Sequence, residues 1–264
     1  MAVFEQSDGG FVATELARGP WDPNAQHGGA PAALLARAFE RTEPEGELLL
    51  ARVTYEFIRP VPLGRLDVHA EVVRPGRRVQ LLEGSISGSD GVELVRARAL
   101  RVHRASVGEA LAPAAGAPAA GAPAGPDTGH RNDYQGVGPM FATHAMEIRF
   151  IDGGFQSLGP ATAWFRLRVP LVEGEQTSSL ERLAAAADFG NGISSILPWD
   201  GSHLFINPDL TVYLERPPSA EWICLEAHTR IAGDGIGVCE SVLYDERGRV
   251  GRATQALLVS RSRK

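Results

Sequence analysis

The chain has 264 residues, with 26 Lys and Arg against 32 Asp and Glu, so its formal net charge is −6. This mild acidity argues against a nucleic-acid-binding protein, which carries a basic footprint. Two cysteines are too few for a disulfide scaffold, and no apolar run approaches the roughly 18 residues of a membrane span. The first residues lack the basic and apolar regions of a secretory signal. We therefore expect a cytoplasmic protein with reduced thiols and with no nucleic-acid or membrane partner.

Much of the excess of Gly (30) and Pro (18) lies in one segment. Residues 104–129 consist largely of Ala, Pro and Gly, which offer no large side chain to bury, and the prolines prevent a continuous helix. This composition predicts a flexible linker over 104–129. It divides the chain into an N-terminal domain, 1–103, and a C-terminal domain, 130–264.

The first half predicts a strand at Phe11–Leu16, a turn at Asn24–Gly29 and one helix at Ala30–Phe39. The helix is rich in Ala and Leu, and Pro31 lies in its first turn, where proline is tolerated. Four extended segments follow, separated by turns that contain Pro or Gly: 48–59, 66–74, 78–88 and 92–103.

The second half predicts the same order of elements. Two strands, 146–150 and 161–169, precede an N-cap sequence at Ser178–Glu181 and an Ala-rich helix at 182–197. The extended segments after the helix are 205–216, 222–232, 235–244 and 249–260. If the second and third of these form a hairpin, Cys224 lies near Leu243, out of bridging range of Cys239.

The two halves align without gaps at an offset of 157 residues. Ten of about fifty aligned positions are identical: Thr54, Arg59, Pro60, Ala70, Gly76, Glu83, Gly91, Ala99, Leu100 and Val102 match Thr211, Arg216, Pro217, Ala227, Gly233, Glu240, Gly248, Ala256, Leu257 and Val259. A repeat of this length predicts a duplicated domain. Each copy is a helix with a four-stranded antiparallel meander around it, so the predicted fold is an α+β double hotdog.

Motifs in both halves resemble those of the type II acyl-CoA thioesterases (TesB-like), which carry a double hotdog in one chain. The motifs are His27-Gly28-Gly29 and Tyr55–Gly64 in the first half, and Ala186-Ala187-Asp188, Tyr213–Pro217 and Ala253-Thr254-Gln255 in the second. The resemblance covers residues 10–260 apart from the linker. It implies hydrolysis of the thioester of an acyl-CoA substrate, without a cofactor.

In that family an Asp in the second helix, a Thr or Ser on the next strand and a Gln on the last strand hold the attacking water. These positions correspond to Asp188, Asn207 and Gln255. Asn207 departs from the pattern, because an amide can bind water but cannot share a proton as a hydroxyl does. We place the thioester carbonyl near His27, Gly28 and Gly29, where glycines allow close approach to a helix N-terminus.

Each candidate also has a purely structural interpretation. Asp188 is next to Gly190-Asn191-Gly192 and fits a cap at a helix break, and Asn207 fits a turn before Pro208. Gln255 fits a satisfied polar group on a strand. The remaining three fit local structure: Gly28 and Gly29 fit close helix–sheet packing, and His27 fits a hydrogen-bonded loop residue.

Other kinds of site lack their motifs. The seven histidines are isolated, so we expect no zinc site, and no Gly-x-Ser-x-Gly elbow or phosphate-binding glycine motif follows a strand. Arg77-Arg78 and the basic residues 261–264 suit either coenzyme A phosphates or a solvated turn and tail.

Two alternatives to a thioesterase stay open. One is a non-catalytic acyl-binding double hotdog, which the amide of Asn207 favours. The other is a hotdog hydratase, which the sequence supports less, because that family expects an Asp and a His a few residues apart and His27 has no such Asp after it. In each case we expect a homodimer or a larger homo-oligomer, since hotdog sheets usually pair through their edges and faces.

Overall fold

The computed structural model describes residues 1–43, 46–106, 122–131, 134 and 138–262. Within them, 14 strands form one antiparallel sheet in the order β1-β2-β4-β5-β6-β3-β11-β14-β13-β12-β9-β8-β7, with β10 paired to β14. The N-terminal half contributes β1 Phe4–Ser7, β2 Gly10–Ala13, β3 Leu48–Phe57, β4 Gly64–Arg74, β5 Val79–Gly88 and β6 Glu93–His103. The C-terminal half contributes β7 His130–Arg131, β8 Met146–Asp152, β9 Ala161–Leu167, β10 His203–Ile206, β11 Asp209–Leu214, β12 Ile223–Ile231, β13 Ile236–Asp245 and β14 Gly248–Arg261.

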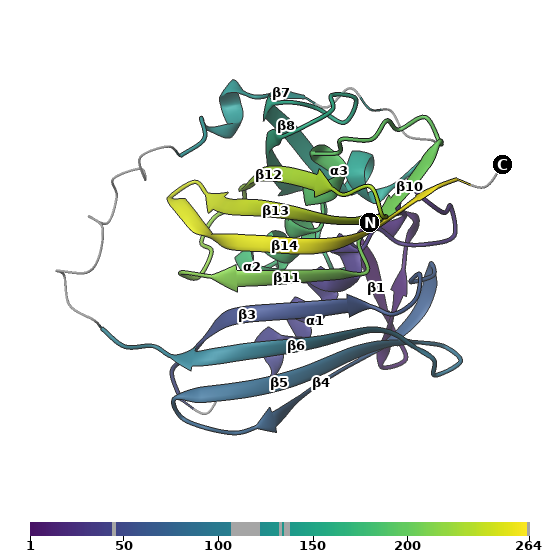
Figure 1. Cartoon of the computed structure of the whole chain (residues 1–264). Helices are drawn as coiled ribbons and strands as arrows, with labels where there is room; N and C mark the ends of the chain where they lie inside the picture. The colour runs from purple at the N-terminus through teal and green to yellow at the C-terminus, as the bar shows by residue number, and fades with distance from the viewer. Residues whose placement is uncertain (44–45, 107–121, 132–133, 135–137, 263–264) are drawn as a thin grey trace.

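Two helices, α1 Gly29–Arg41 and α2 Ser179–Ala187, lie behind the sheet in Figure 1. A third short helix, α3, spans Gly190–Ile193, and single turns occur at Glu15–Ala17, Pro126–Thr128 and Phe141–Ala145. The small residues of the helices let the sheet wrap closely around them, and one buried core extends through both halves. The predicted N-cap at Ser178 is confirmed, because its side chain and that of Glu181 form a capping box.

Within the sheet, the two halves meet along one strand pair, β3 with β11. In this antiparallel pair Thr54 lies opposite Thr211, its own partner in the sequence repeat, and the two hydroxyl oxygens are 3.2 Å apart. A residue facing its own duplicate marks the pseudo-twofold axis. Outward from this axis, the order β3-β6-β5-β4-β2-β1 matches the order β11-β14-β13-β12-β9-β8, and only β7 and β10 have no counterpart among the described residues. The predicted duplication and the α+β double hotdog are confirmed.

The gapless offset of 157 does not hold on the last strand. Glu83 pairs with Arg98 in the first half, whereas its duplicate Glu240 pairs with Thr254, which shifts the equivalence there to 156. The identities predicted on β6 and β14 are therefore out of register by one residue. Ala99 accordingly corresponds to Gln255, and both side chains are buried.

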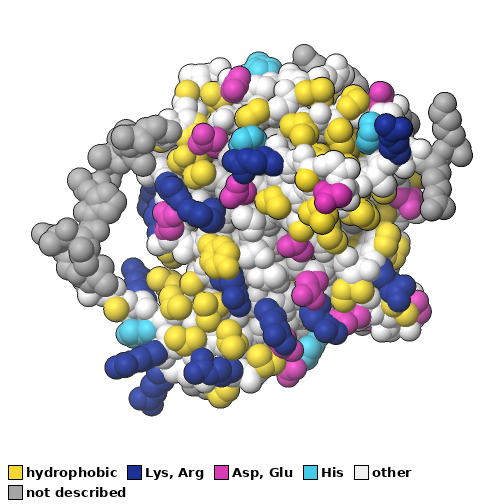
Figure 2. All heavy atoms as spheres, in the orientation of Figure 1, with side chains coloured by type: hydrophobic (Ala, Val, Ile, Leu, Met, Phe, Trp, Pro, Cys, Tyr) yellow, Lys and Arg dark blue, Asp and Glu magenta, His cyan; other side chains and the backbone are white. Residues whose placement is uncertain are grey.

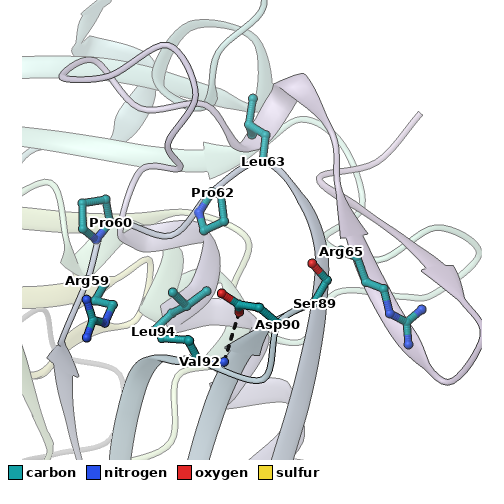
Figure 3. Close-up of a pocket in the computed structure, with 10 residues that line it drawn as sticks. Arg59, Pro60, Pro62, Leu63, Arg65, Ser89, Asp90, Val92 and Leu94 are labelled. Atoms are coloured by element: carbon teal, nitrogen blue, oxygen red, sulfur yellow. Dashed lines mark hydrogen bonds between the residues drawn. The ribbon is translucent and has the colours of Figure 1, made fainter.

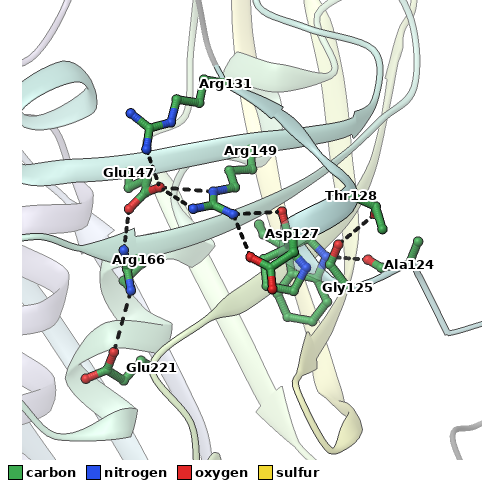
Figure 4. Close-up of polar contacts among 11 residues, drawn as sticks. Ala124, Gly125, Asp127, Thr128, Arg131, Glu147, Arg149, Arg166 and Glu221 are labelled. Atoms are coloured by element: carbon green, nitrogen blue, oxygen red, sulfur yellow. Dashed lines mark hydrogen bonds and ion pairs between the residues drawn. The ribbon is translucent and has the colours of Figure 1, made fainter.

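The end of the predicted linker lies on the outer face of the sheet. The Trp164 indole donates a hydrogen bond to the Ala124 carbonyl (2.7 Å), and Arg149 forms an ion pair with Asp127 (2.9 Å) while also contacting Glu147, as Figure 4 shows. The remaining linker residues 107–121 lie outside the described residues, so the flexible linker and the domain boundaries stay predictions.

Several local expectations are refined. Phe11–Leu16 is not one strand, because β2 ends at Ala13 and Thr14 caps a short turn. Cys224 lies opposite Tyr244, next to the expected Leu243; it and Cys239 are both free and buried. No helix among the described residues is long and apolar enough to cross a membrane.

Candidate active site

Asp188 lies at a break between two helices. The sequence predicts one helix over 182–197, but α2 ends at Ala187 with Asp188 as its C-cap, and α3 begins at Gly190. Glycine is a poor helix former. Its absent side chain also matters, because a Cβ on Gly190 would lie only 2.7 Å from the Ser241 hydroxyl and 2.9 Å from the Gln255 side-chain oxygen. The break therefore allows the Asp188 segment to pack directly on β13 and β14.

The Asp188 carboxylate is buried, with an exposed fraction of 5%. Its Oδ1 accepts a hydrogen bond from Asn207 Nδ2 at 2.8 Å and a longer one from Gln255 Nε2 at 3.4 Å. Its Oδ2 is 3.1 Å from His27 Nδ1. Three side chains that are distant in the sequence thus satisfy one buried carboxylate, which would otherwise be costly to bury.

His27 connects the two halves of the molecule at this point. Its ring stacks on Phe189 with a centroid distance of 4.2 Å, and its Nδ1 is within 3.1 Å of both the Gly29 N–H and Asp188 Oδ2. A ring nitrogen that donates a proton to Asp188 cannot accept one from Gly29. The two contacts are therefore alternatives, and protonation of Nδ1 releases the Gly29 N–H for another acceptor.

The two glycines bring the start of α1 against Asp188. A Cβ on Gly28 would lie 2.7 Å from Asp188 Oδ2, and a Cβ on Gly29 would collide with the Ala185 carbonyl. These glycines therefore allow close packing of α1 on α2, and not the helix–sheet packing of their structural interpretation. The same packing places the partial positive charge of the α1 N-terminus beside the carboxylate.

Asn207 separates β10 from β11. The sequence predicts one strand over 205–216, but Pro208 cannot supply a ladder hydrogen bond, and the strand is interrupted there. The Asn207 amide donates to the Asp209 carbonyl (3.1 Å) as well as to Asp188. The half-buried Asn207 is therefore both a turn residue and a neighbour of the carboxylate.

Gln255 lies on β14 with an exposed fraction of 2%. Its side-chain oxygen accepts a hydrogen bond from the Asn191 N–H (3.1 Å), and its amide nitrogen donates to the Asp188 carbonyl (3.2 Å). The hydrogen bond from the Asn191 backbone to Gln255 was not predicted from the sequence. The Gly190-Asn191-Gly192 run next to Asp188 was the one sequence feature that indicated an irregular backbone there.

The loops that carry His27 and Asn207 are joined by aromatic contacts. Trp21, six residues before His27, stacks on Trp199 at a centroid distance of 4.8 Å, and Phe205 meets both rings edge-on. The two indoles belong to different halves of the chain. This cluster holds the two loops in a fixed relation, so the polar groups are positioned before any ligand binds.

The structure brings together all six predicted site residues: His27, Gly28, Gly29, Asp188, Asn207 and Gln255. Arg77 and Arg78 lie elsewhere, in the β4–β5 turn at the opposite end of the sheet (Figure 1). Among the described residues, no group of three or more His, Cys, Asp or Glu side chains is placed to hold a metal ion.

Comparison with family models gives two matches along the chain. Residues 17–102 match the acyl-CoA thioesterase N-terminal domain, and residues 113–259 match the acyl-CoA thioesterase C-terminal domain. The chain belongs to the acyl-CoA thioesterase family. Among curated proteins, no sequence matches this thioesterase-family chain.

Solved structures share the fold of this family member at low sequence identity. A protein described as having a hot dog fold, from Alicyclobacillus acidocaldarius, superposes with a TM-score of 0.71 at 17% identity, covering 97% of this chain and 95% of that one. The acyl-CoA thioesterase II TesB2 of Mycobacterium marinum gives a TM-score of 0.63 at 15% identity, covering 94% and 96%. The tesB protein of Mycobacterium avium subs paratuberculosis gives 0.64 at 13% identity, covering 97% and 96%.

Proposed function

We propose that this protein hydrolyses acyl-CoA thioesters to a free fatty acid and coenzyme A, with Asp188 as the general base. The observation that carries the proposal is the convergence of one buried carboxylate and two side-chain amides at the start of α1. Hydrolysis of a thioester needs a positioned water, a base for its proton and donors for the developing oxyanion. Each requirement has a candidate here.

In the proposed reaction Asp188 takes a proton from water as the water oxygen attacks the thioester carbonyl carbon. Asn207 Oδ1 accepts no hydrogen bond from the described residues, so it is available to orient the second water proton. The oxyanion lies at the N-terminus of α1, where the Gly28 N–H is a donor and the Gly29 N–H becomes a second one when His27 Nδ1 carries a proton and donates to Asp188. Collapse of the tetrahedral intermediate breaks the carbon–sulfur bond, and the proton held by Asp188 passes to the leaving thiolate.

A non-catalytic acyl-binding protein is the second candidate. It is favoured by the direct bond between the Asn207 amide and Asp188, because this amide stands where the family has a hydroxyl and cannot relay a proton. The two candidates differ in turnover and not in binding. A measurement of turnover therefore separates them.

The test is release of free thiol from a series of acyl-CoAs of increasing chain length. We expect turnover of at least one of them, and a loss of about 100-fold or more in kcat for Asp188→Asn, which removes the base but keeps the size of the side chain. Circular dichroism and the melting temperature show whether the variant is folded. Stable acyl-CoA binding without thiol release by the folded wild type would favour the non-catalytic candidate.

We also infer a homodimer or larger homo-oligomer. The support is a group of exposed apolar side chains on the outer face of the sheet, including Ile236, which is 64% exposed, Val238, Leu258 and Tyr213. Figure 2 shows the same face, with apolar side chains among charged ones. Light scattering coupled to size-exclusion chromatography measures the state directly.

A further inference from the structure

An open hollow of about 750 Å³ lies near one end of the sheet, formed by two turns of the N-terminal half. One wall is the loop between β3 and β4, and the other is the turn between β5 and β6 (Figure 3). Its lining residues are Arg59, Pro60, Pro62, Leu63, Arg65, Gly88, Ser89, Asp90, Val92 and Leu94. None of them belongs to the candidate active site.

The wall between β3 and β4 is bonded on both sides to segments that carry site residues. The Gln26 N–H donates to the Val61 carbonyl (2.8 Å), and the Gln26 side chain donates to the Pro62 carbonyl (2.8 Å), directly before His27. At the start of the same loop, the Phe57 N–H donates to the Pro208 carbonyl (2.8 Å), directly after Asn207. The loop that forms this wall of the hollow is therefore hydrogen-bonded to the segments that carry His27 and Asn207.

Of the charged side chains that line the hollow, one arginine has no partner among the described residues. Arg65 is tied to the Ser7 carbonyl and to Asp67, and the Asp90 carboxylate accepts from the Val92 N–H. Arg59 is exposed, and its guanidinium has no hydrogen bond or ion pair with any described residue. Two Arg and one Asp give the hollow a net positive charge in a molecule whose overall charge is −6.

The remaining lining is mainly apolar. Pro60, Pro62, Leu63, Val92 and Leu94 offer flat or branched hydrocarbon surface beside the free Arg59. A ligand that suits both parts has a planar or apolar portion and several negative charges. Guanidinium groups are well matched to phosphate, because they present several donors in a fixed planar arrangement.

We propose that this hollow binds the phosphorylated adenosine end of coenzyme A, with Arg59 as a phosphate ligand. The proposal rests on the proposed function, since it makes the site's substrate a coenzyme A thioester. A carrier-protein thioester has a pantetheine arm but no adenosine, so it cannot use the hollow in this way. The pantetheine arm would run from the hollow along the Val61–Leu63 wall toward His27.

The test compares one acyl group on two thiols. Octanoyl-CoA carries the phosphorylated adenosine, and octanoyl-N-acetylcysteamine lacks it. For Arg59→Ala we expect KM for octanoyl-CoA to rise about tenfold with kcat little changed, and kcat/KM for the N-acetylcysteamine thioester to be unaffected. Arg78→Ala is the matched control, because it removes an equally exposed arginine at the opposite end of the sheet.

Two results would overturn the inference: an unchanged KM for octanoyl-CoA in Arg59→Ala, or equal losses with both thioesters. Failure of the proposed function is distinguishable, because it would abolish hydrolysis of both thioesters by the wild type. Titration calorimetry with free coenzyme A tests the hollow in that case. A dissociation constant weakened about tenfold by Arg59→Ala and not by Arg78→Ala would support the inference, and equal constants for all three proteins would contradict it.

Discussion

Helices α1 and α2 pack antiparallel, so at each end of the pair the N-terminus of one helix lies beside the C-terminus of the other. The pseudo-twofold axis relates these two ends, so each is a potential site. Only one of them has the polar groups of the proposed chemistry. Counted from the helix N-caps, Gly28 and Ser178, Asp188 corresponds to Ala38. By strand register, Asn207 corresponds to Leu50 and Gln255 to Ala99. The duplicate site thus has apolar residues at all three positions.

The two ends also differ in how charges meet the helix dipoles. At the end without the site, Glu181 lies in the first turn of α2 and Arg41 in the last turn of α1, where the helix dipoles favour each charge, although burial opposes the charge of Glu181. Arg101 adds hydrogen bonds to the Phe39 and Thr42 carbonyls, which end α1. At the site, Asp188 lies at the C-terminal end of α2, where a negative charge is disfavoured, but also beside the N-terminus of α1, where it is favoured. The two helix dipoles therefore oppose each other at Asp188, whereas at the other end both charges match the dipole of their own helix.

After replacement of the Asp188 base itself, the largest effect should come from making the site resemble its duplicate at β14. Gln255→Ala removes the amide that contacts Asp188, and we expect kcat to fall about 100-fold. The buried Asn191 N–H loses its acceptor, so the free energy of unfolding should fall by about 1–3 kcal/mol. Thr254→Ala, the neighbour on the other face of β14, is the control. Equal activities of the two variants in the acyl-CoA assay would rule out a role for Gln255.

A smaller effect is expected at Asn207. Asn207→Leu copies the duplicate residue Leu50 and should lower kcat about 10-fold, because the carboxylate loses its closest side-chain donor. Asn207→Thr restores the family's hydroxyl and should keep or raise kcat. Steady-state kinetics on the best acyl-CoA checks both variants. If the leucine variant retains full kcat, Asn207 is a turn residue only.

The smallest effect is expected on stability, at the end of the helix pair without the site, where Glu181 lies. The pKa of Glu181 is raised to about 7, mainly because the carboxyl group is buried; Glu40 and Glu175 add to the rise, while the hydrogen bond from the Ser178 N–H and the charge of Arg37 oppose it. The unfolded chain loses this proton near pH 4.5 and the folded chain only near pH 7, so this contribution to stability is present below pH 4.5 and is lost as pH rises to 7. Glu181→Gln removes the penalty and keeps an acceptor for the Ser178 N–H.

We therefore expect the melting temperatures of Glu181→Gln and the wild type to agree near pH 4.5 and to differ by a few degrees at pH 8, with the variant higher. Differential scanning calorimetry across this range makes the comparison. A difference that does not change with pH would contradict the raised pKa.

The sequence predicted most elements because apolar spacing and turn residues are local signals. It missed β1, although this strand pairs with β2 across a tight turn at Asp8 and Gly9, which is a local signal in the sequence. The Phe4 N–H donates in addition to the distant Leu171 carbonyl (2.8 Å). It extended the helix through Asp188 and the strand through Asn207, although Gly190 and Pro208 are local signals for the two interruptions. The hollow beside Arg59 could not be foreseen, since the two turns that form it meet only in the folded sheet.

The grouping of the six site residues was predicted through the family resemblance, while their chemical roles stay predictions. Composition alone did not separate Gln255 from any other buried glutamine. The direct contact between His27 and Asp188 was not predicted, because it depends on the two glycines that let α1 approach α2.

The β3–β11 pair has a consequence for either half in isolation. Without its neighbour, each half would present a long strand with unpaired N–H and C=O groups, the kind of edge that recruits other chains. In the intact protein, β3 and β11 pair with each other, so each half covers the open edge of the other. Because both halves belong to one chain, this pairing does not depend on the protein concentration. Separating β3 from β11 would reopen that edge, so we expect a ligand to reach the buried carboxylate through the loops at the end of the sheet while the strand pair stays intact.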